Sequence, residues 1–277
     1  MTHRRAAALA ALVATAAALL SGSAAAQSFT AQPQLYLLTT DAFDARALWI
    51  QPAGLAAIRE ASVSGFFTTA TQRGQGPTQY GLSLASGGLG LSWQHDRLGN
   101  GASDNQWAIG LGVGNQTVKV GVARRWIRGA NANDAALDLG MRITPRPSVL
   151  LSLAWRDIGS PVVRDTVVRA VLVPGAALAL FGARARIGVD WELVTRGWGT
   201  SALRAGASIV LPLSLALSVR ADYSGSLHAR GVVLALTWNA ASARAVAFGA
   251  WPSAGGVSQA GAWAAAVRSL DAPRRTF

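Results

Sequence analysis

Few residues of this chain have the types and spacing that catalysis requires. His95 stands next to Asp96, and the pair could form half of a hydrolytic site, but no nucleophile motif accompanies it. His228 is distant in the sequence, and neither histidine is spaced from another histidine or a carboxylate as metal ligands are. The chain has no cysteine, which excludes thiolate ligands and disulfides. We therefore predict that the protein is not an enzyme and has no catalytic residues, no metal site and no cofactor.

Charged residues that alternate with apolar ones offer a different chemistry, that of a polar interior. Arg186 precedes the apolar Ile187, for example, and Asp190 precedes Trp191. The charged residues in this phase are Lys119, Arg125, Asp138, Arg142, Arg156, Arg186, Asp190, Glu192, Arg204, Arg220 and Asp222. They could form a salt-bridge network that fills and stiffens the interior, or they could line a polar conduit or a site for an amphiphile with an acidic head. On the second interpretation, the substrate-binding residues are Arg125, Arg142, Arg156, Arg186, Asp190, Arg204, Arg220 and Asp222.

The elements that would position these residues are β-strands with two unlike faces. In residues 107–114, Trp, Ile, Leu and Val fall on one face, and Ala and three Gly fall on the other. These glycines, Gly110, Gly112 and Gly114, lack the helix and the Lys-Ser/Thr pair of a phosphate loop, and small residues facing a crowded interior explain them better. A repeat of about ten residues with one apolar and one polar face is typical of a barrel wall between lipid and water. The sequence thus predicts an all-β fold, a transmembrane antiparallel up-and-down barrel.

We predict about fourteen strands, although twelve or sixteen fit the same pattern. They lie near residues 61–72, 76–86, 88–97, 104–114, 117–127, 135–144, 148–157, 170–181, 184–195, 201–211, 213–223, 229–239, 243–251 and 258–268. The connections alternate between longer and shorter, like the external loops and periplasmic turns of outer-membrane barrels. This alternation predicts that the protein lies in the outer membrane of a Gram-negative bacterium with both termini periplasmic.

Tryptophans mark both ends of the predicted strands. Trp238 lies toward the periplasmic end of its strand, and those toward the outer ends are Trp93, Trp107, Trp126, Trp155 and Trp191. Because amphipathic indole rings prefer the membrane–water interface, this placement predicts aromatic girdles.

The first sixty residues do not follow the strand pattern. Fifteen apolar or small residues, Ala6 to Leu20, follow a basic start and precede an Ala-x-Ala site, which predicts a signal peptide over residues 1–26. Residues 27–60 form a separate N-terminal segment without strands, in which Asp41 is expected to cap a short helix through Phe43, Ala47 and Leu48. The barrel itself is assigned to residues 61–277.

The strongly basic charge, +12 with a pI near 11.6, does not indicate a nucleic-acid partner. The arginines are scattered singly through apolar strands and form no basic run. We expect them in a polar lumen or at the membrane surface, where they pair with phosphates of outer-membrane lipid, including lipopolysaccharide.

Three segments resemble the FadL-like and PorV/PorQ-like outer-membrane proteins. Residues 41–56 (DAFDARALWIQPAGLA) are similar to their N-terminal region, which carries Asn-Pro-Ala-x-Leu where this chain has Gln51 in place of Asn. Two further segments, residues 151–161 (LSLAWRDIGSP) and 186–192 (RIGVDWE), are similar to recurrent sequence segments of the PorV-like group. The resemblance implies a fourteen-stranded barrel whose residues 27–60 fold into the lumen as a plug, around Trp49, Gln51, Pro52 and Ala53.

The resemblance also implies two functions of different kinds. In FadL-like proteins the plug gates hydrophobic substrates, so the leading prediction is passage of a hydrophobic or amphipathic small molecule across the outer membrane. The alternative is a PorV/PorQ-like scaffold for secretion, which binds exported proteins at its outer loops. The longest predicted loop, Ile158 to Arg169, is small for a protein partner, which favours transport.

Overall fold

The computed structural model describes residues 37–70, 78–97, 103–129, 132–163, 166–196, 199–240, 242–252 and 259–269. The predicted signal peptide, residues 1–26, and residues 27–36 of the predicted plug lie outside the described residues.

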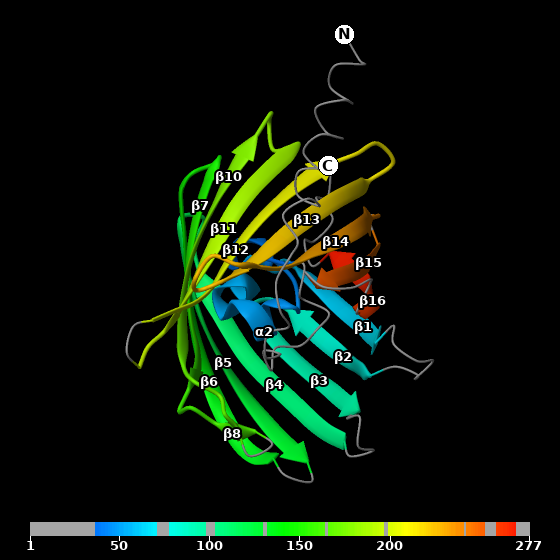
Figure 1. Ribbon diagram of the computed structural model, residues 1–277. Coiled ribbons are helices and arrows are strands. Elements are labelled where there is room, and N and C mark those ends of the chain that lie inside the picture. The colour runs from blue at the N-terminus through cyan, green and yellow to red at the C-terminus, as the bar shows by residue number, and fades with distance from the viewer. Residues whose placement is uncertain are drawn as a thin grey trace.

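Fourteen antiparallel strands close into a single barrel (Figure 1). They are β1 (Glu60–Ala70), β2 (Gln79–Ser86), β3 (Leu89–Arg97), β4 (Ser103–Gly114), β5 (Val118–Gly129), β6 (Ala132–Arg146), β7 (Val149–Ile158), β10 (Val171–Leu180), β11 (Ala185–Val194), β12 (Gly199–Val210), β13 (Leu215–Ser224), β14 (Ala229–Asn239), β15 (Ala243–Pro252) and β16 (Gln259–Ser269). Neighbouring strands pair in sequence order, and β1 pairs with β16 to close the barrel. A separate hairpin of β8 (Val162–Val163) and β9 (Thr166–Val167) stands between β7 and β10.

The predicted fold class, strand count and strand positions are confirmed. Every strand bound lies within three residues of its predicted place, because the two-residue period persists along each strand. The connections alternate less strictly in length than predicted. A longer loop was expected between β5 and β6, but β5 continues to Gly129 and β6 already begins at Ala132.

The two ends of the barrel differ in their connections. We call the end that holds the start of β1 and the end of β16 the turn end, and the opposite one the loop end. At the turn end, Gly87 and Gly88 join β2 to β3 with φ values of 54° and 90°. Glycine adopts this left-handed region without steric cost, which permits the tight reversal.

The outer face of the barrel is an apolar band. Its exposed side chains include Val63, Leu82, Leu84, Leu91, Ile109, Leu111, Val120, Val122, Leu139, Leu151, Ile187, Val189 and Leu236. Such a band is favourable in lipid and costly in water, so the barrel has the surface of a membrane-spanning protein. No helix within the described residues is long and apolar enough to span a bilayer.

The six tryptophans predicted to form girdles lie on the outer face, toward one or the other end of the barrel. Trp93, Trp107 and Trp126 are direct cross-strand partners on β3, β4 and β5, and together they form one row toward the loop end. Trp155 and Trp191 are about half exposed on the same face, and Trp238 lies toward the turn end. This arrangement is typical of side chains placed at membrane interfaces.

Candidate functional site

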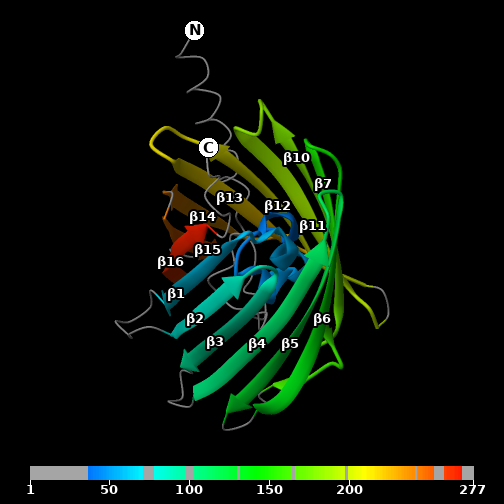
Figure 2. The same cartoon turned by 180° about the vertical axis from the view of Figure 1, so that it is seen from behind.

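The segment from Leu37 to Ile58 lies inside the barrel as a plug (Figure 1). It contains two 3-10 turns, η2 (Thr39–Asp41) and η3 (Pro52–Ala57), and the short helix α2 (Ala47–Ile50). Seen from behind, it lies between the near wall of β1–β6 and the far wall (Figure 2). The fold thus places Trp49, Gln51, Pro52 and Ala53 in the lumen, where all four are buried.

The helix start predicted in this segment is wrong. α2 begins at Ala47 after Arg46, and no side chain caps it. Asp41 instead accepts a hydrogen bond from the backbone N–H of Leu38, at 3.2 Å. Its carboxylate therefore stabilises the preceding turn and leaves the helix uncapped.

A belt of luminal glycines makes room for the plug. We define the glycine belt as Gly90, Gly110, Gly112, Gly121 and Gly140 of β3, β4, β5 and β6. Gly112, Gly121 and Gly140 are successive cross-strand partners, and so are Gly90 and Gly110. A Cβ atom at any of these five positions would overlap plug atoms of Leu48, Gln51, Pro52, Ala53, Leu55 or Ala56. Gly110 and Gly112, predicted from the sequence as small luminal residues, are therefore part of the surface on which the plug packs. The third predicted glycine, Gly114, is exposed at the end of β4 and adjoins Val118 instead of the plug.

Gln51 ties the plug to the wall through its amide. Its Nε2 donates hydrogen bonds to the carbonyl oxygens of Met141 (3.1 Å) and Leu153 (3.0 Å), on β6 and β7. Its Oε1 accepts a hydrogen bond from the backbone N–H of Ala53, at the start of η3. An amide serves both roles at once because it carries a donor and an acceptor. An asparagine here would have to reach the wall with a side chain one carbon shorter.

Three wall arginines hold the plug by its backbone carbonyls, and we call Arg142, Arg186 and Arg220 the plug-holding arginines. Arg142 donates to the carbonyl oxygens of Ala42 (2.6 Å) and Thr40 (2.8 Å). Arg186 also donates to Thr40 (2.7 Å), and Arg220 donates to the carbonyl of Leu37 (3.1 Å). These bonds are charge-assisted and stronger than neutral ones.

Asp190 of the wall also holds the plug, as an acceptor of hydrogen bonds. Both the backbone N–H and the hydroxyl of Thr39 donate to its carboxylate at 2.7 Å. Four of the predicted substrate-binding residues, Arg142, Arg186, Asp190 and Arg220, thus contact the plug in this structure.

The other predicted luminal charges, apart from Lys119, pair with one another or with Asp157 toward the loop end. Lys119 lies near the turn end, where its Nζ donates a hydrogen bond to the carbonyl oxygen of Gln116 at 3.3 Å. Arg125 contacts Asp138 (2.8 Å) and Asp157 (2.5 Å). Glu192 lies between Arg156 (3.2 Å) and Arg204 (2.8 Å). Asp222 pairs with the plug-holding Arg220 at 2.7 Å. These residues form the salt-bridge network that the sequence offered as the simpler interpretation.

One sector of the luminal wall is apolar, and the expectation of a uniformly polar lumen is wrong there. We define the apolar sector as Phe66, Val233, Val246, Phe248 and Trp263, all of them buried inside β1 and β14–β16. They pack in one cluster with Trp49 and Ile50 of the plug.

The alternation of residues did not predict the facing of this sector, because here the large apolar side chains face the lumen and the small ones face outward. On β15 the large Val246 and Phe248 face inward, while Ala245, Ala247 and Gly249 take the outward phase. The sequence does alternate between large and small apolar residues in this sector. Because both kinds are compatible with lipid, this alternation does not indicate which kind faces the lumen.

A charged pair of the plug lies against the apolar sector. Arg46 contacts Asp44 through Nε at 2.8 Å, and its guanidinium carbon lies 4.2 Å from the ring centroid of Trp263. Burial raises the pKa of Asp44 to about 6, and it lowers the pKa of Arg46 to about 9. The indole N–H of Trp263 is buried and has no hydrogen-bond acceptor among the described residues.

The two histidines of the described residues, His95 and His228, lie outside this site. His95 packs on the outer face near Tyr80 and contacts Asn105 through Nδ1 at 3.1 Å. His228 contacts the hydroxyl of Ser226 in an exposed turn. The hydrogen bonds of the described residues give neither histidine a carboxylate partner, and no metal-binding group of three His, Cys, Asp or Glu occurs in this part of the chain.

Comparisons with known proteins support the fold. No protein-family model and no curated protein matches the sequence. Among solved structures, the toluene transporter TbuX of Ralstonia pickettii is similar with a TM-score of 0.59 and 10% identity, over 82% of this chain and 94% of that chain. The toluene transporter TodX of P. putida gives 0.54 and 10% identity, over 83% and 95%. A FadL homologue of Pseudomonas aeruginosa gives 0.51 and 10% identity, over 90% and 100%. The barrel therefore has a FadL-like fold.

Proposed function

We propose that this barrel passes hydrophobic or amphipathic small molecules across the outer membrane, with the plug as its gate. The observation that carries the proposal is the division of the luminal wall into an apolar sector and a charged sector, with the plug packed against both. A molecule with an apolar body and a polar head would find a surface for each part, as ligand sites generally provide. The neighbours named toluene transporters share the fold that would hold such a path.

The apolar sector provides a surface for the apolar body once the plug moves. Phe66, Phe248 and Trp263 belong to one hydrophobic cluster with residues of the plug, so a displaced plug would leave their rings facing the lumen. The indole N–H of Trp263, which has no acceptor within the described part of the chain, is a buried donor that an oxygen of an amphiphile could satisfy. On the charged side, displacement of the plug would release Arg142 and Arg186 from its carbonyl oxygens to pair with an acidic head, while Arg220 keeps its pair with Asp222.

The secretion scaffold remains the alternative because its partners would bind at the loop end. There the β8–β9 hairpin exposes Val162 and Val167, and its Val162 N–H is tethered to Asp134 at 2.7 Å. Because each of its strands has only two residues, this hairpin offers a small surface for binding a protein partner.

Mass spectrometry of what remains bound after gentle detergent extraction from the native membrane tests the proposal. A fatty or other amphipathic molecule bound at one copy per barrel is the expected result. If the bound molecule is lost in Trp263→Ala but retained in the outer-face variant Trp238→Ala, it binds in the apolar sector. An exported protein recovered reproducibly, without a small ligand, would contradict transport and support the scaffold.

A further inference from the structure

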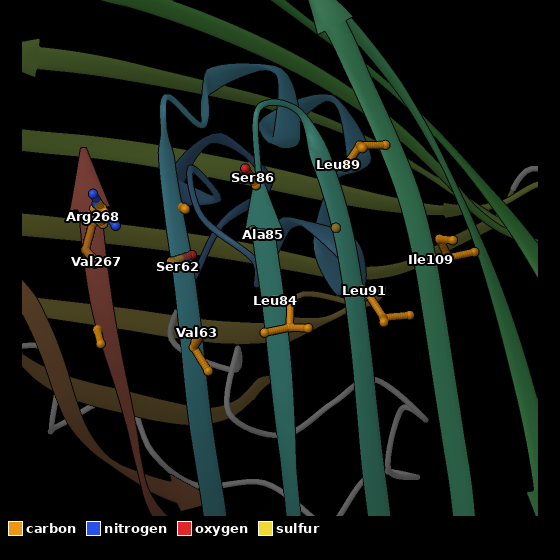
Figure 3. A pocket seen from close by; sticks show the side chains of 13 residues that line it. Ser62, Val63, Leu84, Ala85, Ser86, Leu89, Leu91, Ile109, Val267 and Arg268 are labelled. Carbon is orange, nitrogen blue, oxygen red and sulfur yellow. The ribbon is translucent and has the colours of Figure 1, made fainter. Parts of the chain in front are cut away.

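The outer face of the barrel carries a furrow beside the closing pair of strands. One hollow of about 640 Å³ lies at the turn end over β16 and β1–β4, and Val63, Leu84, Leu91 and Ala266 line it (Figure 3). A second hollow, of about 540 Å³, continues two residues further along β16, β1, β2 and β3. We call the two hollows together the outer furrow.

Small side chains create the outer furrow. The outward positions of β16 are Ala262, Ala264 and Ala266, and β1 contributes Gly65 between Val63 and Phe67. The outward residues of β2 and β3 are large by contrast, and they form a raised edge of leucines and Trp93. The floor is therefore lower than the surrounding apolar band.

The turn end of the outer furrow carries the guanidinium of Arg268. Among the described residues that line the two hollows, Arg268 is the one with a charged side chain, and it is exposed at the end of β16. Within the described residues it makes no ion pair with a carboxylate, unlike Arg244, which pairs with Glu60 nearby. Its charge is available to an anion outside the barrel.

The dimensions of the outer furrow suit one acyl chain. From Arg268 to Ala262 the strand rises about 20 Å at roughly 3.4 Å per residue. With a strand tilt of about 40°, this covers about 15 Å of depth, half of a hydrocarbon core about 30 Å thick. Arg268 ends this span at the turn end, one residue before the end of β16.

We propose that the outer furrow binds one membrane phospholipid, whose acyl chain lies over Gly65 and Ala264 and whose phosphate pairs with Arg268. A second copy of the chain is a poorer occupant. In a two-fold contact, the same concave surface would face itself and leave a void, whereas close packing requires filled volume. A flexible acyl chain fills such a shape without this restriction.

Native mass spectrometry of the delipidated full-length barrel, titrated with phosphatidylglycerol or with diacylglycerol of the same chains, tests the proposal. We expect one bound phosphatidylglycerol, with affinity about fivefold lower in Arg268→Ala, as one surface arginine contributes. Diacylglycerol should bind more weakly by a similar factor and should not respond to Arg268→Ala. Ala266→Phe, which fills the hollow, should abolish binding of both lipids.

Two matched variants serve as controls. Arg184→Ala removes an exposed arginine from a turn at the same end, and Ala247→Phe enlarges an outward alanine on β15 outside the lining. Both should bind phosphatidylglycerol normally, and heat-dependent electrophoretic mobility confirms that each variant is folded. Equal binding by all variants, or a dimer mass in place of a lipid adduct, would overturn the proposal. Loss in Ala266→Phe without any effect of Arg268→Ala would overturn recognition of the phosphate.

Discussion

Gly121 on β5 and Pro52 in the plug occupy adjoining space so tightly that a Cβ atom on Gly121 would overlap the backbone of Pro52. The wall and the plug are therefore fitted to each other at a position where neither side has a side chain that could move away. This contact sits at the centre of the glycine belt, between Gly112 and Gly140.

Gly121→Ala should loosen the plug without unfolding the barrel. The added methyl cannot fit beside Pro52, and such overpacking costs about 1–3 kcal/mol, which here opposes docking of the plug. We expect faster protease cleavage within the plug and greater solute permeability of reconstituted vesicles. Gly65→Ala is the control, because a Cβ there faces outward and meets Leu82 at an ordinary 3.6 Å. Equal effects of the two substitutions would contradict the fit.

Arg142 and Arg125 should have separable roles. Arg142→Ala removes two bonds to plug carbonyls, each worth about 1.5–3 kcal/mol for a charged donor, so the plug should become mobile while the barrel keeps its stability. Arg125→Ala leaves Asp138 and Asp157 together without their cation, which should lower barrel stability by about 3–5 kcal/mol. Urea unfolding and plug proteolysis, measured on both variants, distinguish these effects. The same profile for both variants would refute the assignment.

Trp155→Arg should impair membrane insertion more than Arg156→Ala. Trp155 is exposed on the outer face, where an arginine costs about 2–4 kcal/mol at mid-membrane and less near the interface. Arg156 faces the lumen, and without it Glu192 still pairs with Arg204. Folding yield in lipid vesicles measures the difference, and an inverse order would mean that the facing assignment is wrong.

Docking of the plug should weaken as the pH rises from about 4 to about 6. Burial raises the pKa of Asp44 to about 6 in the docked plug, so this state binds the proton more tightly than the undocked one. The resulting stabilisation is fully present below the ordinary pKa of 3.8 and is lost as the pH passes 6. Burial also raises the pKa of Asp41, which acts in the same direction. Plug proteolysis across this pH range should show the change, and Asp44→Asn should reduce it.

The sequence predicted the wall better than the interior. The strand bounds could be predicted because a two-residue period persists from β1 to β16. The inward facing of Arg125, Arg142 and Asp190 could be predicted because a charged side chain that faces lipid destabilises the barrel. The contacts of the plug could not be predicted, because they join Thr39 to Asp190 and Leu37 to Arg220 across long sequence separations. The apolar sector was missed because alternation between large and small apolar residues does not say which kind faces lipid.

If the N-terminal segment is the gate, the barrel should fold without it and become permeable. The test is deletion of Phe29 to Ala53 in the full-length protein, followed by measurement of small-solute permeability in reconstituted vesicles. We expect a folded, heat-modifiable barrel with much higher permeability than the intact protein. A variant that fails to fold would show that the segment belongs to the structural core, and a folded variant with unchanged permeability would show that it is not the gate.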